Sequence, residues 1–248
     1  MSSSAESAAG QDRSFFWRRL HSLSGVFPVG AFLLEHLYTN YYAINGVEAY
    51  NEKVRGLTEL PMVLILEIAF IYIPLAYHAL YGVWVWWRGD GNLAHYPWTG
   101  NWMYSLQRWS GLVTMAYIAF HAWEQRFSGA HIIGNYFIAF SKVQHSIARP
   151  AVHAFYVIGL LAACFHFAYG VWLFACKWGF APGRAAQRKL LWACAALFVV
   201  LSGTGLLSLR RIATVPLQPR PEELIKMRSQ KSEARSQNPE APGHRAAF

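Results

Sequence analysis

Long apolar stretches separated by short polar connections dominate the pattern of this chain. A helix needs about twenty apolar residues to cross the hydrocarbon core of a membrane. Stretches of that length occur at residues 20–42, 60–87, 103–123, 151–176 and 190–209. Pro28 and Pro74 lie inside the first two, where each removes a backbone donor and should bend its helix. The pattern therefore predicts an all-α integral membrane bundle of five transmembrane helices.

The segments outside the apolar stretches are polar. Residues 1–19 end in Arg18 and Arg19 directly before the first apolar stretch, without the pattern of a signal peptide. Residues 210–248 combine eight basic residues with several prolines and few large apolar side chains. We therefore expect a cytoplasmic N-terminal segment at 1–19, the membrane domain at 20–209, and a disordered, basic, proline-containing tail at 210–248.

Lysine and arginine in the connections indicate the orientation, because they are retained on the cytoplasmic side of a membrane. The connections divide them into a larger set on the side of the N-terminus (Arg13, Arg18, Arg19, Arg88, Lys177, Arg184, Arg188 and Lys189) and a smaller set on the other side (Lys53, Arg55, Arg126, Lys142 and Arg149). We therefore expect a multi-pass protein of the cytoplasmic membrane with its N-terminus inside. Five crossings then place the C-terminus outside, although the basic tail argues mildly for the opposite side.

The composition agrees with a membrane protein, since 54% of the residues are hydrophobic and only 14% are charged. The net charge of +9 does not indicate a nucleic-acid-binding protein, because the basic residues are scattered between apolar stretches rather than gathered on one face. Cys164, Cys176 and Cys194 lie in apolar stretches without CxxC or CxxCH spacing. The sequence therefore predicts neither a disulfide framework nor a covalently attached haem.

Four of the ten histidines lie inside the apolar stretches, away from their ends. Ionisable residues at such depths are energetically expensive and usually face the bundle interior, so each is a functional-site hypothesis. Helix rise places His78 and His166 about 14 to 15 Å from the cytoplasmic ends of their helices, and His36 and His121 roughly 9 Å from the outer ends. Two imidazoles at one depth suit the two axial positions of a haem. We therefore expect four of the helices to enclose two haems, held by an inner pair, His78 and His166, and an outer pair, His36 and His121.

A repeated motif supports this pairing. The pattern HxxYGVW begins at His78 and again at His166, so the first two helices resemble the next two as a weak tandem repeat. Gly82 and Gly170 follow these histidines by four residues on the same helix face, where a missing side chain would let a flat macrocycle approach the backbone. Gly25 and Gly111 could do the same in the first and third helices.

Other polar residues are weaker candidates. His21 could reach the propionates of an inner haem, or could lie at the membrane interface. Arg108 is our first choice for a propionate partner, although it could merely anchor a helix end. Glu67 lies about 10 Å inside the second helix, which suggests proton handling or quinol contact. Glu35 and Glu124 flank the outer pair and could relay protons or face solvent.

The histidines by themselves leave other interpretations open. They could only form hydrogen bonds between helices, and metal binding without haem would need further ligands that these positions do not offer. A haem-free transporter could use the four histidines and Glu67 as a proton relay. A two-haem anchor of another membrane dehydrogenase, such as a hydrogenase or a formate dehydrogenase, would contain the same histidines.

Several motifs, in order along the chain, resemble the cytochrome b558 membrane subunits of succinate dehydrogenase. They are RRLHSLSGVFPVG, LLEH, LEIAFIYIPLAYHALYG, NWMYSLQRWSG, FHAWE and CFHFAYGVW. The resemblance covers approximately residues 15–179, and the tail lies beyond it. It implies a five-helix anchor with two haem b groups whose axial ligands are the same four histidines, in the same pairs.

The resemblance also implies partners and a reaction. The anchor would bind flavoprotein and iron–sulfur subunits on the cytoplasmic side and form a succinate:quinone oxidoreductase, the respiratory complex II that also serves the tricarboxylic acid cycle. The quinone implied is menaquinone, reacting near the outer haem, with electrons passing through the inner haem. The chain itself contains no flavin-binding glycine motif or cysteine cluster, so the succinate site is expected on a partner subunit.

Overall fold

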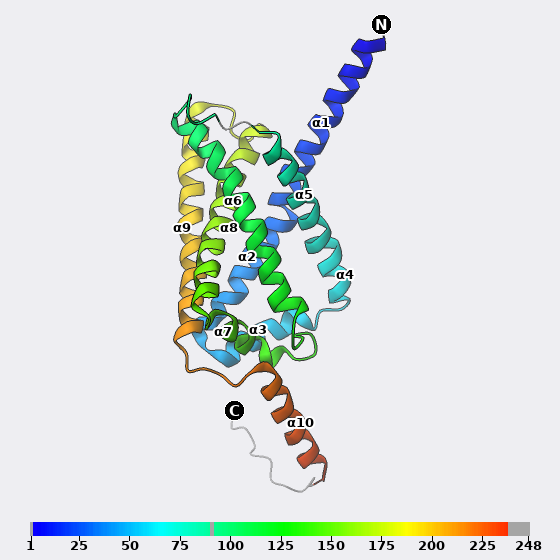
Figure 1. Cartoon of the computed structure of the whole chain (residues 1–248), viewed down its shortest axis with the longest axis vertical. Coiled ribbons are helices and arrows are strands. Elements are labelled where there is room, and N and C mark those ends of the chain that lie inside the picture. The colour runs from blue at the N-terminus through cyan, green and yellow to red at the C-terminus, as the bar shows by residue number, and fades with distance from the viewer. Residues whose placement is uncertain (1, 90–91, 238–248) are drawn as a thin grey trace.

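The structure, a computed structural model, describes residues 2–89 and 92–237, with the backbone alone described for residues 2–13. Within these ranges every regular element is helical and none is a strand. Long helices run side by side along the length of the molecule, and the N-terminal helix projects from one end of the bundle (Figure 1). The predicted all-α fold is therefore confirmed.

The first predicted span is formed by α1 (Ser2–Val26) and α2 (Pro28–Tyr41). The two helices meet at Phe27, and Pro28, which cannot donate a backbone hydrogen bond, is the first residue of α2. The predicted bend at Pro28 thus separates two helices. The polar segment at 2–19 continues α1 toward the N-terminus, because it contains no proline that would end the helix.

The second predicted span comprises α4 (Val63–Glu67), the π-helical turn η2 (Ile68–Tyr72) and α5 (Ile73–Trp87). The wide turn directly precedes Pro74, the second residue of α5. Proline cannot complete the regular α-helical bonding, and a π-helical turn is one way in which a helix accommodates the disturbance.

Three more long helices complete the bundle. α6 (Thr99–Ala122) continues into a second π-helical turn, η3 (Trp123–Phe127), and is followed by α8 (Pro150–Lys177) and α9 (Arg184–Thr214). The most extensive helix packing joins α8 to α6 and α9. The short helices α3 (Val47–Thr58) and α7 (Ala139–Ile147) lie at the end of the bundle opposite the N-terminus (Figure 1). They are connected to the long helices through η1 (Tyr42–Asn45) and η4 (Tyr136–Ile138).

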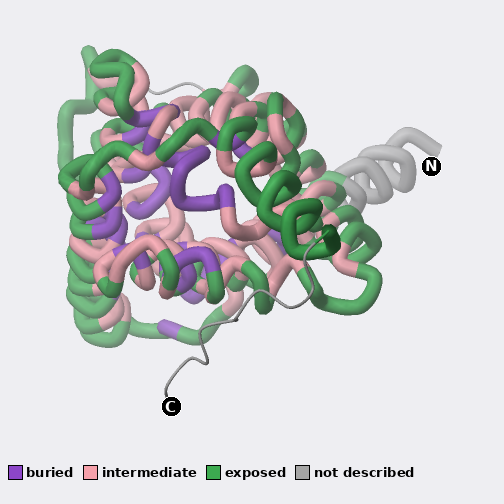
Figure 2. The backbone as a smooth tube through the Cα atoms, turned by 90° about the horizontal axis from the view of Figure 1, so that it is seen from below, coloured by how far each residue is buried: buried purple, intermediate pink, exposed green. Residues whose placement is uncertain are grey.

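Buried residues concentrate in the interior of the bundle, and the peripheral helices are exposed along most of their length (Figure 2). One buried cluster, which includes Tyr50, Phe140 and Tyr156, joins the short helices to α8. Another, which includes Leu37 and Cys164, joins α2, α8 and α9. α8 is therefore central to the core.

Large apolar side chains are exposed on the outside of the bundle. None of the residues of α4, η2 and α5 is buried, and Ile65, Phe70 and Leu80 are each more than half exposed. Three described helical segments, Val63–Trp87, Pro150–Lys177 and Arg184–Thr214, are long and apolar enough to cross a membrane. Such a surface is stable in lipid and costly in water, so this is a membrane protein.

The C-terminal part differs from the disordered tail that the sequence predicts for 210–248. α9 continues to Thr214, and α10 (Pro221–Gln237) forms a further helix; residues 238–248 lie outside the described part. The segment between these helices is attached to α7, where the amide of Gln144 donates to the carbonyl oxygens of Ile212 and Val215 at 3.1 and 2.8 Å. The buried side chain of Gln144 thus supplies hydrogen-bond partners for backbone groups of this segment. The composition of the segment itself gives no sign of this partner.

Candidate functional site

The four histidines His36, His78, His121 and His166 lie in two facing pairs, with the same partners that the sequence analysis expects. The ring centroids of the inner pair, His78 of α5 and His166 of α8, are 6.1 Å apart with the ring planes at 82°. Those of the outer pair, His36 of α2 and His121 of α6, are 5.6 Å apart at 78°. Each pair therefore joins two helices across the bundle interior.

A backbone carbonyl and a glycine of α1 hold the ring of His78. Its Nδ1 lies 3.0 Å from the carbonyl oxygen of His21. A Cβ atom built on Gly25 would lie 2.3 Å from Cε1 of the same ring, far closer than packed atoms can approach. The glycine is therefore required for α1 and this imidazole to lie in contact.

α6 holds the ring of His166 in the same way. Its Nδ1 lies 3.0 Å from the carbonyl oxygen of Gln107, and a Cβ atom on Gly111 would lie 2.8 Å from its Cε1. The two glycines occur in a second repeat, Leu-x-x-x-Ser-Gly, at 20–25 and 106–111. This repeat was the signal that would have identified Gln107, which the sequence analysis did not select.

The other glycines selected from the sequence face the same two polar residues. A Cβ atom on Gly82 would lie 3.3 Å from Cε1 of His21, and one on Gly170 would lie 3.5 Å from Nε2 of Gln107. An added Cβ would therefore be slightly tight at Gly82 and in ordinary contact at Gly170. The contacts of the tandem repeat are equivalent on both sides of the inner pair.

Several buried polar atoms around the inner pair have no hydrogen-bond partner among the described residues. They include Nδ1 of His21, Oη of Tyr81, Oγ of Ser105 and Oε1 of Gln107. The ring of His21 also stacks on that of His78, with centroids 4.1 Å apart and planes at 10°. Because buried polar groups usually have partners, this region of the bundle is suited to a polar ligand group.

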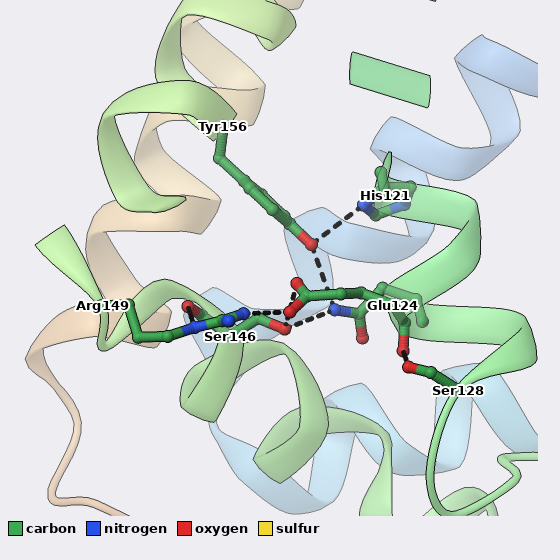
Figure 3. A network of polar contacts seen from close by, with 7 residues as sticks. His121, Glu124, Ser128, Ser146, Arg149 and Tyr156 are labelled. Atoms are coloured by element: carbon green, nitrogen blue, oxygen red, sulfur yellow. Dashed lines mark hydrogen bonds and ion pairs between the residues drawn. The ribbon is translucent and has the colours of Figure 1, made fainter. Parts of the chain in front are cut away.

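The outer pair has a side-chain partner instead of a backbone one. Nδ1 of His121 lies 3.2 Å from the hydroxyl oxygen of Tyr156 on α8, and Figure 3 shows this phenol pointing toward the imidazole. Tyr156 could not be identified from the sequence, since it lies 35 residues from His121 and tyrosines are frequent in this chain.

Arg108 connects the N-terminal half of α6 to the C-terminal end of α5. Its Nη2 donates to the carbonyl oxygen of Val85 at 3.0 Å, and its guanidinium lies over the ring of Tyr104. A Cβ atom on Gly89 would lie 1.3 Å from its Nη1. Arg108 therefore bridges α6 and the end of α5.

Glu67, the last residue of α4, has a charged partner. Nη2 and Nε of Arg126, on η3, donate to its Oε2 at 2.8 and 3.1 Å. The two side chains are only 21% and 24% exposed. The ion pair thus links α4 to η3. Both hydrogen bonds end on the same carboxylate oxygen, Oε2.

The geometry of the pairs fits a metal held between two imidazoles. An imidazole nitrogen lies about 2 Å from a bound transition-metal ion, so rings on opposite sides of one ion have centroids about 6 Å apart. The observed 5.6 and 6.1 Å agree with this separation. Among the described residues, no group of three or more His, Cys, Asp or Glu is arranged to hold a metal ion. The pairs therefore suit a metal that brings its remaining ligands with it, as the iron of haem does.

Fold and site together define a helical membrane protein with two facing pairs of histidines in the bundle interior. The chain is 38% identical, over 198 residues, to the succinate dehydrogenase cytochrome b558 subunit of Bacillus subtilis (strain 168); the match spans 79% of this chain and 95% of that protein. It belongs to the family of succinate dehydrogenase cytochrome b558 subunits. No family model matches the sequence.

Proposed function

We propose that this chain is the membrane anchor of a succinate dehydrogenase, holding two haem b groups and passing electrons between an iron–sulfur partner subunit and a membrane quinone. The observation that carries the proposal is the pair of facing imidazoles at each of two depths, in a chain of the cytochrome b558 family. Bound haem supplies one-electron redox chemistry.

The axial ligands in this proposal are His78 and His166 for the inner haem, and His36 and His121 for the outer one. The backbone carbonyls beside Nδ1 of His78 and His166 favour the tautomer with the proton on Nδ1, which leaves Nε2 to bind iron. The rings are thereby oriented before iron binds. Preorganisation of this kind increases metal affinity.

The partnerless polar atoms of His21 and Gln107 lie next to the inner pair and are candidates to meet the propionates of the inner haem. Arg108 is a further candidate, because a guanidinium has five N–H donors and the bond to Val85 uses one of them. Gly82 and Gly170 contribute by letting the helices approach closely.

In the membrane, the spans would be α1 with α2, α4 to α5, α6, α8 and α9. The N-terminus would be cytoplasmic and the C-terminus outside, in the cytoplasmic membrane. The flavoprotein and iron–sulfur subunits would bind the cytoplasmic end, where α1 extends beyond the bundle (Figure 1). Electron transfer from the inner to the outer haem would move charge through the membrane potential. The free energy involved is about 2.3 kcal/mol for each elementary charge that crosses 100 mV.

Quinone, and by resemblance menaquinone, would react near the outer haem. Glu67 is the candidate proton acceptor or donor there, because Arg126 binds its Oε2 and leaves Oε1 to face a quinol hydroxyl. Arg126 would hold the carboxylate in position during the reaction.

A reduced-minus-oxidised spectrum with a haem-to-protein ratio tests the proposal on the purified complex. We expect two b-type haems per chain, and the loss of one when any of the four histidines is replaced by alanine. His131→Ala is the matched control, because this exposed outer-loop histidine is outside both pairs and its loss should leave both haems bound. A folded chain without haem would overturn the proposal and favour the proton-relay interpretation.

A further inference from the structure

A chain of hydrogen bonds leads from the outer pair to the outer end of the bundle (Figure 3). It begins at His121, whose Nδ1 contacts Oη of Tyr156 at 3.2 Å. The amide of Gln125 donates to that phenol oxygen at 3.1 Å and to Oγ of Ser146 at 2.9 Å. Ser146 in turn donates to Oε2 of Glu124 at 2.7 Å, so three side chains connect the imidazole to a carboxylate.

The network is buried where it meets the histidine and opens at its outer end. Tyr156 is 2% exposed, and Gln125 and Ser146 are each 8% exposed. Glu124 forms an ion pair with Arg149, which is itself exposed. Hydrogen bonds in such a low-dielectric region are strong and hold a single arrangement.

The directions of the bonds between Glu124 and Tyr156 follow from the carboxylate inward. The carboxylate of Glu124, paired with Arg149, accepts the hydroxyl proton of Ser146, which leaves the oxygen of Ser146 free to accept from Gln125. The amide nitrogen of Gln125 can only donate, so it occupies one lone pair of the phenol oxygen of Tyr156. The second lone pair can accept the Nδ1–H of His121, which is the direction required if Nε2 of His121 binds iron.

The two histidine pairs therefore differ in the groups that contact Nδ1. In the inner pair the shortest contact of each Nδ1 is a backbone carbonyl at 3.0 Å, which no substitution of a side chain removes, and Oγ of Ser110 lies farther from Nδ1 of His166, at 3.4 Å. In the outer pair the contact of His121 is the phenol of Tyr156, whose own acceptor strength is weakened by the amide of Gln125. The hydrogen-bond partner of His121 can thus be changed by substituting a side chain.

We propose that Tyr156 is a positioning residue that keeps the Nδ1–H tautomer of His121 and, through that bond, lowers the reduction potential of the outer haem. This rests on the proposed function. An accepted hydrogen bond makes the imidazole a more basic ligand, and a more basic ligand favours the ferric over the ferrous state. Gln125 acts in the opposite sense, since it competes for the same oxygen.

A spectroscopic redox titration of the intact complex carrying Tyr156→Phe tests this inference. Removal of the acceptor should raise the midpoint potential of the outer haem alone. For this one-electron couple, a shift of about 59 mV corresponds to a tenfold change in the ratio of oxidised to reduced haem. Tyr117→Phe is the matched control, because the ring of Tyr117 also contacts His121, with centroids 5.6 Å apart, without a hydrogen bond to it in the described part of the chain. The control should leave both potentials unchanged.

A second variant, Gln125→Met, supplies a test of opposite sign. It removes the donor that competes for the phenol oxygen, so the potential of the outer haem should fall. Unchanged potentials in Tyr156→Phe, equal shifts of both haems, or loss of the outer haem in both variants would overturn the role of Tyr156. A wild-type complex without haem would instead overturn the proposed function, so the two failures are distinguishable.

Discussion

At the scale of single residues, glycines determine how closely a helix can approach the ring of a histidine. We expect Gly25→Ala to displace the ring of His78, because the added Cβ would lie 2.3 Å from it. The haem-to-protein ratio should fall from two to one, with a loss of stability of about 1–3 kcal/mol from overpacking. Absorption spectra and thermal unfolding of the purified complex measure both effects.

Gly203→Ala is the control for this substitution, since a Cβ atom on Gly203 of α9 would have no neighbour within 4 Å. It should retain both haems. If Gly25→Ala also retained both at full stability, the ring of His78 would not depend on contact with α1.

Glu67 is a second residue whose role can be tested separately from haem binding. Glu67→Gln keeps the shape of the side chain and removes its charge, so proton transfer at this position should fail while the haems stay bound. We expect quinone reduction by succinate to fall by about 100-fold or more, with unchanged haem spectra and unchanged succinate oxidation by an artificial acceptor.

Glu59→Gln supplies the comparison, because Glu59 is an exposed carboxylate in a surface ion pair with Arg55. Its quinone reductase rate should equal that of the wild type. An equal rate in Glu67→Gln would remove Glu67 from the quinone reaction.

At the scale of helices, the connection between α9 and α10 depends on Gln144 of α7. Its amide donates to the carbonyls of Ile212 and Val215, and its Oε1 accepts the backbone N–H of Gln218 at 2.9 Å. Gln144→Ala leaves these groups without partners, at a cost of about 1–3 kcal/mol. We expect faster amide hydrogen exchange and faster proteolysis at residues 212–220 than in the wild type.

Gln218→Ala is the matched control for this connection. The side chain of Gln218 is half-buried and, among the described residues, donates to the nearby carbonyl of Pro216, while its backbone bond to Gln144 remains. Exchange at 212–220 should then match the wild type, and equal exchange in Gln144→Ala would contradict the anchoring role.

At the scale of the whole molecule, the odd number of crossings in the proposal predicts that the two ends lie on opposite sides of the membrane. Gly183→Cys, in the exposed connection between α8 and α9, should react with an impermeant maleimide only from the cytoplasmic side. Ser236→Cys, in α10, should react only from the outside. The parent chain gives the background labelling, because Cys164 and Cys194 are buried and Cys176 is half-buried. Labelling of both variants from the same side would refute the five-span topology.

Much of this architecture follows from the sequence alone. Stretches of about twenty apolar residues set the helices, and the constant rise of a helix converts the positions of His36, His78, His121 and His166 into depths. The repeat HxxYGVW indicated which helices are equivalent. Apolar length, helix rise and sequence repetition are local properties, and for that reason they could be derived without a fold.

The tertiary structure alone decided which side chains surround each histidine. Periodicity in a nearly uniform apolar helix does not define its rotation about its own axis, so the contact of Gly25 with His78, the bond from Tyr156 to His121 and the ion pair of Glu67 with Arg126 could not be derived. The ordered connection to α10 was missed for a related reason, because its hydrogen bonds come from α7, 68 or more residues earlier in the chain. The local sequence sets the depth of a residue along its helix, and the packing of helices sets which residue it faces.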